Sequence, residues 1–304
     1  MGEVKMSGSE PAVAPPIEPG YFHRLGLAAR MEDAYVPWLQ RVLGAVPIDS
    51  GMRQVQGIPF GHVGESASNE SGAATSEMLW LGALPICIFA ADDEVGPLGH
   101  FVARNGPGLH SVAWTVNDIW KTESLLRRAE LRVTGVDIAG RHFFIHPADT
   151  AGLLIEITDT EFTHDPRDDA SFLPPRPTDS VVQGADLAWM TVAVADPAKS
   201  AEILTNLIVS TVVEGLPRAA GEEVIDLRMH DVVIRLAKRP ADDVRRDQFD
   251  SFCLSVPDLA DSCRRLEADG ISVASQEGEL AWTEQADTLG MKIQWVQASA
   301  LPKP

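Results

Sequence analysis

The chain has 304 residues, enough for two domains with separate hydrophobic cores. Its 25 basic and 44 acidic residues give a formal net charge of -19, and such a surface repels nucleic acid and anionic lipid. No stretch reaches the roughly 20 apolar residues of a membrane span. The three cysteines, Cys87, Cys253 and Cys263, form no disulfide framework, which favours a cytoplasmic protein. The expected partner is a small-molecule substrate rather than nucleic acid or a membrane.

Two segments rich in proline and in small or acidic residues divide the chain. Residues 1–19 have the composition of a disordered tail, and residues 163–184 that of a linker. The predicted domains are therefore 20–162 and 185–298.

A unit of strand, helix and three strands recurs twice in each domain. Its first strands are predicted at HRLGLAA (23–29), HSVAWTV (110–116), WMTVAVA (189–195) and SFCLSV (251–256). Capping residues precede three of the helices, with Asp118, Asp196 and Asp258 at the N-cap, and the first helix is expected to begin near Pro37. The predicted fold class is α+β, with two tandem domains, each of paired βαβββ modules forming an open half-barrel cleft.

The length of the first module points to an insertion. His110 and Glu156 are 46 residues apart in the second module, whereas His23 and Cys87 are 64 apart in the first. The excess falls in residues 51–76, which are rich in Gly, Ser, Ala and Asn. A long loop beside a cleft is typical of a lid or a binding loop.

Four side chains of the first domain occupy equivalent module positions: His23, Cys87, His110 and Glu156. Two imidazoles and a carboxylate that converge form a site for one divalent metal ion, with positions left open for a substrate. Glu156 lies in the apolar run LLIEIT, where an uncompensated carboxylate is costly to bury. Cys87 could be a ligand, a pocket residue or a small apolar core residue.

Two motifs of the first domain resemble a known family. GPGLHSVAWTVNDI (106–119) and FIHPADTAGLLIEITD (144–159) are similar to segments of methylmalonyl-CoA epimerases, members of the vicinal oxygen chelate superfamily. The resemblance implies a half-barrel fold and a metal ion, which could be Fe, Co, Mn, Ni or Zn. The implied metal ligands are His23, His110 and Glu156.

The resemblance leaves three functions open. The first is an epimerase or isomerase acting on an acyl thioester or oxo acid, with Glu77 matching a glutamate that acts as the base in one lineage. The second is an Fe(II) extradiol-type dioxygenase, which needs only two histidines and a glutamate and so tolerates Cys87 at the family's glutamine position. The third is a binding protein without turnover, whose cleft is walled by aromatic side chains.

The second domain offers no comparable set of ligands. Its equivalent positions are Trp189, Arg235, Asp250 and Gln294. Tryptophan does not ligate metals and arginine stays protonated, so a degenerate copy is expected, in which Arg235 and Asp250 pair. Because two fused domains can mimic a dimer of single domains, a monomer and a homodimer are both compatible with the sequence.

Overall fold

The computed structural model describes most of the chain, and the described residues are 16–30, 33–48, 75–91, 96–136, 141–162 and 164–302. Most of the predicted tail (1–19) and of the predicted loop (51–76) lies outside the described residues. None of the helices within those ranges is long and apolar enough to cross a membrane.

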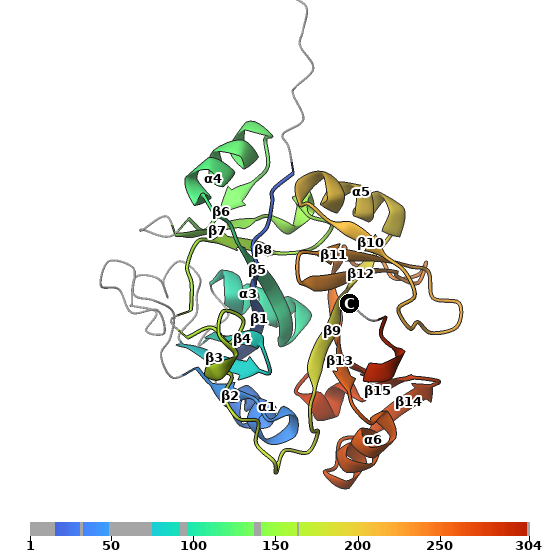
Figure 1. The fold of residues 1–304 in the computed structure, drawn as a ribbon. Helices are drawn as coiled ribbons and strands as arrows, with labels where there is room; N and C mark the ends of the chain where they lie inside the picture. Colours follow the sequence, from blue (N-terminus) through green and yellow to red (C-terminus); the bar gives the residue numbers. More distant parts are fainter. Residues whose placement is uncertain are drawn as a thin grey trace, which may run out of the picture.

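The described residues form two eight-stranded sheets, one in each half of the chain (Figure 1). The first half contains β1 (Phe22–Arg30), α1 (Tyr35–Leu43), β2 (Val46–Pro47), β3 (Thr75–Leu81), β4 (Leu84–Ala91), α3 (Pro97–Asn105), β5 (Gly108–Thr115), α4 (Ile119–Arg128), β6 (Val133–Thr134), β7 (His142–Ile145) and β8 (Ile155–Thr158). The second half contains β9 (Asp186–Val194), α5 (Pro197–Leu207), β10 (Thr211–Val213), β11 (Val224–Met229), β12 (Val232–Lys238), β13 (Gln248–Val256), α6 (Leu259–Ala268), β14 (Val273–Glu277), β15 (Leu280–Thr283) and β16 (Ile293–Gln297).

Both sheets have the same topology. Their strand orders are β2-β3-β4-β1-β5-β8-β7-β6 and β10-β11-β12-β9-β13-β16-β15-β14. In every module the last strand lies parallel to the first, and the two modules of a domain join through their antiparallel first strands. This is the predicted α+β fold of two tandem domains built from paired βαβββ modules.

Local sequence explains where the helices begin. The carboxylates of Asp118, Asp196 and Asp258 accept backbone N–H groups three residues ahead at 2.9, 3.1 and 2.8 Å, so each compensates a free donor of the first turn. Helix α1 begins at Tyr35, close to the predicted Pro37, without a side-chain cap.

Side chains alternate between the two faces of the first sheet. On one face, Leu25, Val112 and Ile155 pack into a core shared with Leu39 of α1 and Leu126 of α4. The opposite face is called here the inner face. It is defined by five residues that are neighbours in the strand register: Arg24, Gly26, Cys87, Ser111 and Glu156.

Helix α3 lies in the link between the two modules of the first domain, outside the βαβββ pattern. Its residues Leu98 and Val102 pack on Ala28, which is two positions along β1 from Gly26 and so on the inner face. The corresponding link of the second domain, residues 239–247, contains no helix. Only the first domain therefore covers part of its inner face in this way.

The two domains contact each other directly. The Tyr35 hydroxyl donates a 2.7 Å hydrogen bond to the carbonyl oxygen of Leu289, and Arg41 forms an ion pair with Asp269. Part of the predicted linker (163–184) is also packed, because the N–H groups of residues 181 and 182 donate to carbonyl oxygens at the end of α1, at 3.0 and 2.8 Å.

Candidate functional site

Strand β1 places Arg24, rather than His23, at the centre of the inner face. Phe22 pairs with Trp114 and Arg24 with Ala113, so His23 is an extra residue in the register between β1 and β5. Ala113 in turn pairs with Glu156 of β8. The extra residue places Arg24 in register with Ala113, and through Ala113 with Glu156.

Arg24 and Glu156 form a buried ion pair. The Nη2 atom of Arg24 contacts Oε1 of Glu156, and the two residues are 3% and 1% exposed. The Nη1 atom of the same guanidinium lies 2.8 Å from Nδ1 of His23. The cation that compensates the buried carboxylate is therefore an arginine of the chain itself.

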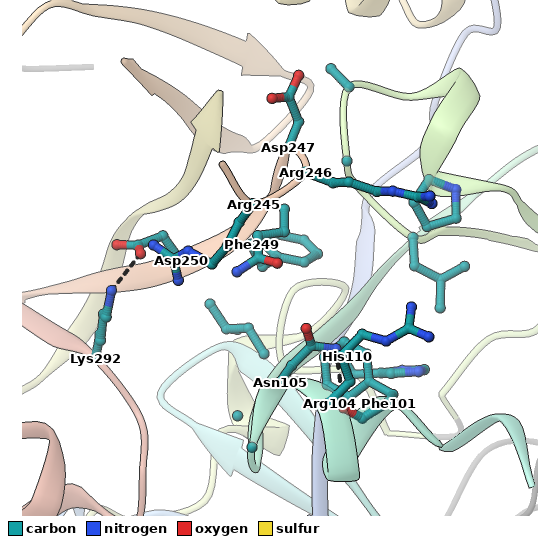
Figure 2. Close-up of a pocket in the computed structure, with 18 of the residues that line it drawn as sticks. Phe101, Arg104, Asn105, His110, Arg245, Arg246, Asp247, Phe249, Asp250 and Lys292 are labelled. Atoms are coloured by element: carbon teal, nitrogen blue, oxygen red, sulfur yellow. Dashed lines mark hydrogen bonds and ion pairs between the residues drawn. The ribbon is translucent and has the colours of Figure 1, made fainter. Parts of the chain in front are cut away.

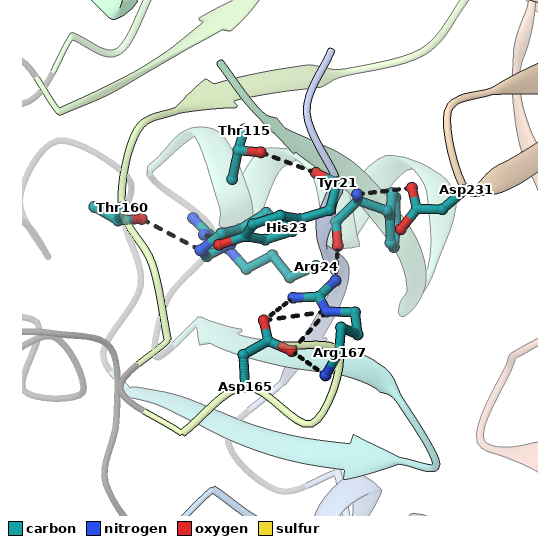
Figure 3. A network of polar contacts seen from close by, with 9 residues as sticks. Tyr21, His23, Arg24, Thr115, Thr160, Asp165, Arg167 and Asp231 are labelled. Atoms are coloured by element: carbon teal, nitrogen blue, oxygen red, sulfur yellow. Dashed lines mark hydrogen bonds and ion pairs between the residues drawn. The ribbon is translucent and has the colours of Figure 1, made fainter. Parts of the chain in front are cut away.

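His23 lies beside this pair with both ring nitrogens engaged. Figure 3 shows the ring with Arg24 and its contact to Thr160. Burial, and then the charge of Arg24, holds the pKa of His23 well below its usual range, so the ring is neutral. A guanidinium can only donate, so Nδ1 accepts and Nε2 carries the proton that faces the Thr160 hydroxyl at 3.3 Å. The ring also stacks on Phe162, with centroids 4.6 Å apart.

His110 lies in a β-bulge of β5. Gly26 pairs with Ser111 and Leu27 with Leu109, so His110 has no partner in the register and Ser111 takes the inner position. The His110 ring contacts Phe101 of α3 edge to face, with centroids 4.8 Å apart. Its Nδ1 is buried without a hydrogen-bond partner among the described residues, and burial lowers its pKa to about 4.

Cys87 lies on the inner face, but Glu77 does not. Burial raises the pKa of the Cys87 thiol to about 12, so it is a neutral side chain at physiological pH. Met78 pairs with Cys87 across β3 and β4. Because neighbouring residues of a strand point to opposite faces, the exposed Glu77 points away from the inner face.

These positions do not fit the predicted three-ligand metal site. Among the described residues, no group of three or more His, Cys, Asp or Glu side chains could hold a metal ion. Glu156 is bound by Arg24, and His23 uses one nitrogen for Arg24 and the other for Thr160. Metal ligation by His23, His110 and Glu156, and a base role for Glu77, therefore stay predictions.

The second domain also contains a buried arginine–carboxylate pair, but with a partner that the sequence did not indicate. Arg235 donates to Asp226 at 2.8 and 3.0 Å and stacks on Trp189, 4.1 Å from the ring centroid. The predicted pairing of Arg235 with Asp250 is wrong. Asp226 is directly opposite Arg235 on the neighbouring strand β11, whereas Asp250 pairs with Lys292 at 2.6 Å.

A cavity of about 1230 Å³ lies between the domains (Figure 2). His110 lines it from the first domain. Asp250, which a matching bulge leaves without a register partner in β13, lines it from the second. The two bulges thus aim equivalent residues of the two domains at one space.

The cavity is rich in cations for so acidic a chain. Its basic side chains are Arg104, Lys199, Arg245, Arg246 and Lys292. Its carboxylates are Asp196, Asp247 and Asp250. None of these five basic residues could be assigned to a site from the sequence, because they lie on α3, on α5, in the link 239–247 and just before β16, and only the packing of the two domains brings them together.

Several of these charges are already compensated. Lys292 pairs with Asp250, Arg245 with Asp243, and Asp247 with Arg239. Within the described ranges, by contrast, Arg104, Lys199 and Arg246 have no carboxylate partner, and all three side chains are exposed. Among the described residues, the cavity therefore presents three cations without an ion-pair partner and one such carboxylate, Asp196, which accepts the Lys199 backbone N–H.

No protein-family model matches the sequence, and no curated protein matches it. Among solved structures, a mutant of 4-hydroxymandelate synthase from Streptomyces coelicolor is similar, with a TM-score of 0.58 and 14% identity over 92% of each chain. A fusion of a xylose isomerase-like TIM barrel with a 4-hydroxyphenylpyruvate dioxygenase gives the same TM-score and identity, over 95% of this chain and 51% of that one. At this identity the likeness is one of fold, and the chain has the two-domain architecture of these structures.

Proposed function

We propose that the chain binds a small organic anion with an apolar body in the cavity between its domains. The observation that carries this proposal is the set of three uncompensated cations, Arg104, Lys199 and Arg246, in a protein of net charge -19. A cavity with an excess of positive charge concentrates anions even when the whole molecule repels them. Guanidinium groups bind carboxylates and phosphates through paired, charge-assisted hydrogen bonds.

Apolar groups in the cavity wall favour a ligand with a hydrophobic portion. Phe101 and Leu109 contribute from the first domain, and Phe249 and Met291 from the second. His110 adds a buried, neutral ring nitrogen that has no partner within the described ranges and that a ligand hydroxyl or amide could bind. Pockets that combine apolar walls with a few polar groups are typical small-molecule sites.

A metal-dependent oxygenase is the second candidate, and the structural neighbours favour it. One neighbour is a 4-hydroxymandelate synthase and the other contains a 4-hydroxyphenylpyruvate dioxygenase, so an aromatic acid appears in both names. The described ligands do not form the site that such chemistry needs. The predicted epimerase has less support, because Glu77 is exposed on the outer side of β3.

Isothermal titration calorimetry of the full chain tests anion binding. We choose benzoate and 4-hydroxyphenylpyruvate as probes, with benzyl alcohol as the neutral counterpart. Arg104→Gln and Arg246→Gln should each weaken binding of the acids about tenfold or more, because a hydrogen bond to a charged group contributes about 1.5–3 kcal/mol. Arg264→Gln is the matched control, since Arg264 pairs with Asp261 on α6 and does not line the cavity.

Three outcomes would contradict the proposal. They are equal affinity for benzyl alcohol and the acids, unchanged affinity in both cavity variants, and no binding of either acid. Oxygen consumption with 4-hydroxyphenylpyruvate, dependent on added Fe(II), would support the second candidate instead.

A further inference from the structure

The inner face of the first domain has an unusual charge arrangement, independent of the cavity between the domains. Glu156 is almost wholly buried, and its neighbours in the strand register, Ala113 and Phe144, are apolar. A buried carboxylate needs a cation or several donors nearby to remain ionised. The guanidinium of Arg24 supplies that cation directly.

The other positions around Glu156 are unsuited to a metal. The register places Ser111, rather than His110, next to Gly26 on the inner face. The space there is small, because a Cβ atom added at Gly26 would lie 2.3 Å from the Ser111 hydroxyl oxygen.

The surroundings also hold Arg24 in place. Its guanidinium bridges Glu156 and Nδ1 of His23, and His23 is fixed in turn by Thr160 and by stacking on Phe162. A metal ion entering this position would have to displace a buried guanidinium and leave it without its carboxylate. Two cations at one carboxylate in a region of low dielectric repel each other strongly.

We propose that Arg24 takes the place of a metal ion at Glu156, and that the first domain holds its inner face together without one. The guanidinium supplies the positive charge, and the ion pair with Glu156 joins β1 to β8 across β5. This inference does not depend on what the cavity between the domains binds.

The test is a metal titration of the full-length chain after dialysis against EDTA. Mn(II), Co(II) and Zn(II) are added separately, and binding is followed by calorimetry together with the urea midpoint of unfolding. We expect no stoichiometric binding that depends on Glu156, and a urea midpoint that neither EDTA nor the added metal shifts.

Two variants separate the inner face from surface binding. Glu156→Gln removes the buried carboxylate, whereas Asp149→Asn, the matched control, removes a partly exposed carboxylate outside the inner face that pairs with Arg132. Binding of one metal ion that Glu156→Gln abolishes and Asp149→Asn retains would overturn the proposal. So would a urea midpoint of the unmodified chain that EDTA lowers and metal restores, a result that needs no folded variant.

Discussion

Replacing Arg24 by methionine should destabilise the protein severely. The substitution keeps an unbranched side chain but leaves the carboxylate of Glu156, which is 1% exposed, without its cation. Removal of one partner of a buried ion pair lowers the free energy of unfolding by about 3–5 kcal/mol. Urea unfolding followed by tryptophan fluorescence measures this loss, since the chain has 7 tryptophans.

The double variant Arg24→Met, Glu156→Gln decides whether the ion pair is the cause. With both charges removed, the total loss should be smaller than the sum of the single losses by about 0.5–3 kcal/mol, the usual coupling between contacting residues. Arg41→Met is the matched control, because Arg41 and Asp269 form an exposed pair whose loss should change stability by about 1 kcal/mol or less. Additive losses at Arg24 and Glu156 would refute the assignment of the ion pair as the stabilising feature.

Three further predictions concern other sites. Burial lowers the pKa of His110 from 6.5 to about 4, so as the pH falls the unfolded chain binds a proton at this residue before the folded chain does. Lowering the pH from 7.5 to 5 should therefore reduce the free energy of unfolding by about 2 kcal/mol through this residue. Urea midpoints should show less acid sensitivity in His110→Gln, and equal sensitivity would contradict this. Gly152→Ala should lower the urea midpoint, since its φ is +90° and an added Cβ would lie 2.2 Å from the Asp247 backbone; an unchanged midpoint would show that the domains separate easily. Iodoacetamide at pH 8 should leave Cys87 and Cys253 unmodified until urea is added, because burial raises both thiol pKa values, and mass spectrometry would detect any early labelling.

The fold could be predicted because local sequence patterns indicate the strands and helices of the modules. Strand-length apolar runs alternate with helices whose first turns are capped by Asp118, Asp196 and Asp258, and all three caps are present. The fourfold repetition then fixed the architecture, since a strand–helix–three-strand unit cannot bury its sheet alone.

The inner face could not be predicted to the residue, because sequence does not reveal irregular register. One extra residue at His23 turns Arg24 inward, and one bulge at His110 turns Ser111 inward. A shift of one residue exchanges the two faces of a strand. Arg24 and Ser111 therefore occupy the inner-face positions beside His23 and His110, whereas Glu156, on a regular strand, lies on the inner face as expected.

The cavity between the domains could not be predicted from the sequence, for a different reason. Arg104 and Arg246 lie in links outside the repeated units, 142 positions apart in the chain. Their convergence is a product of how the two halves dock, which no local pattern encodes.

The segment joining the halves has a consequence for how the chain could be divided. Val182 is fully buried and donates its N–H to the carbonyl oxygen of Val42, so the end of the predicted linker is attached to α1 as well as joining the two halves. Cleavage of the chain before Val181 would leave residues 181 and 182, which bind α1, in the carboxyl-terminal fragment. The ion pair between Arg41 and Asp269 would also connect the two fragments. The two pieces then have the complementary surfaces expected of a split protein that reassembles without a covalent bond.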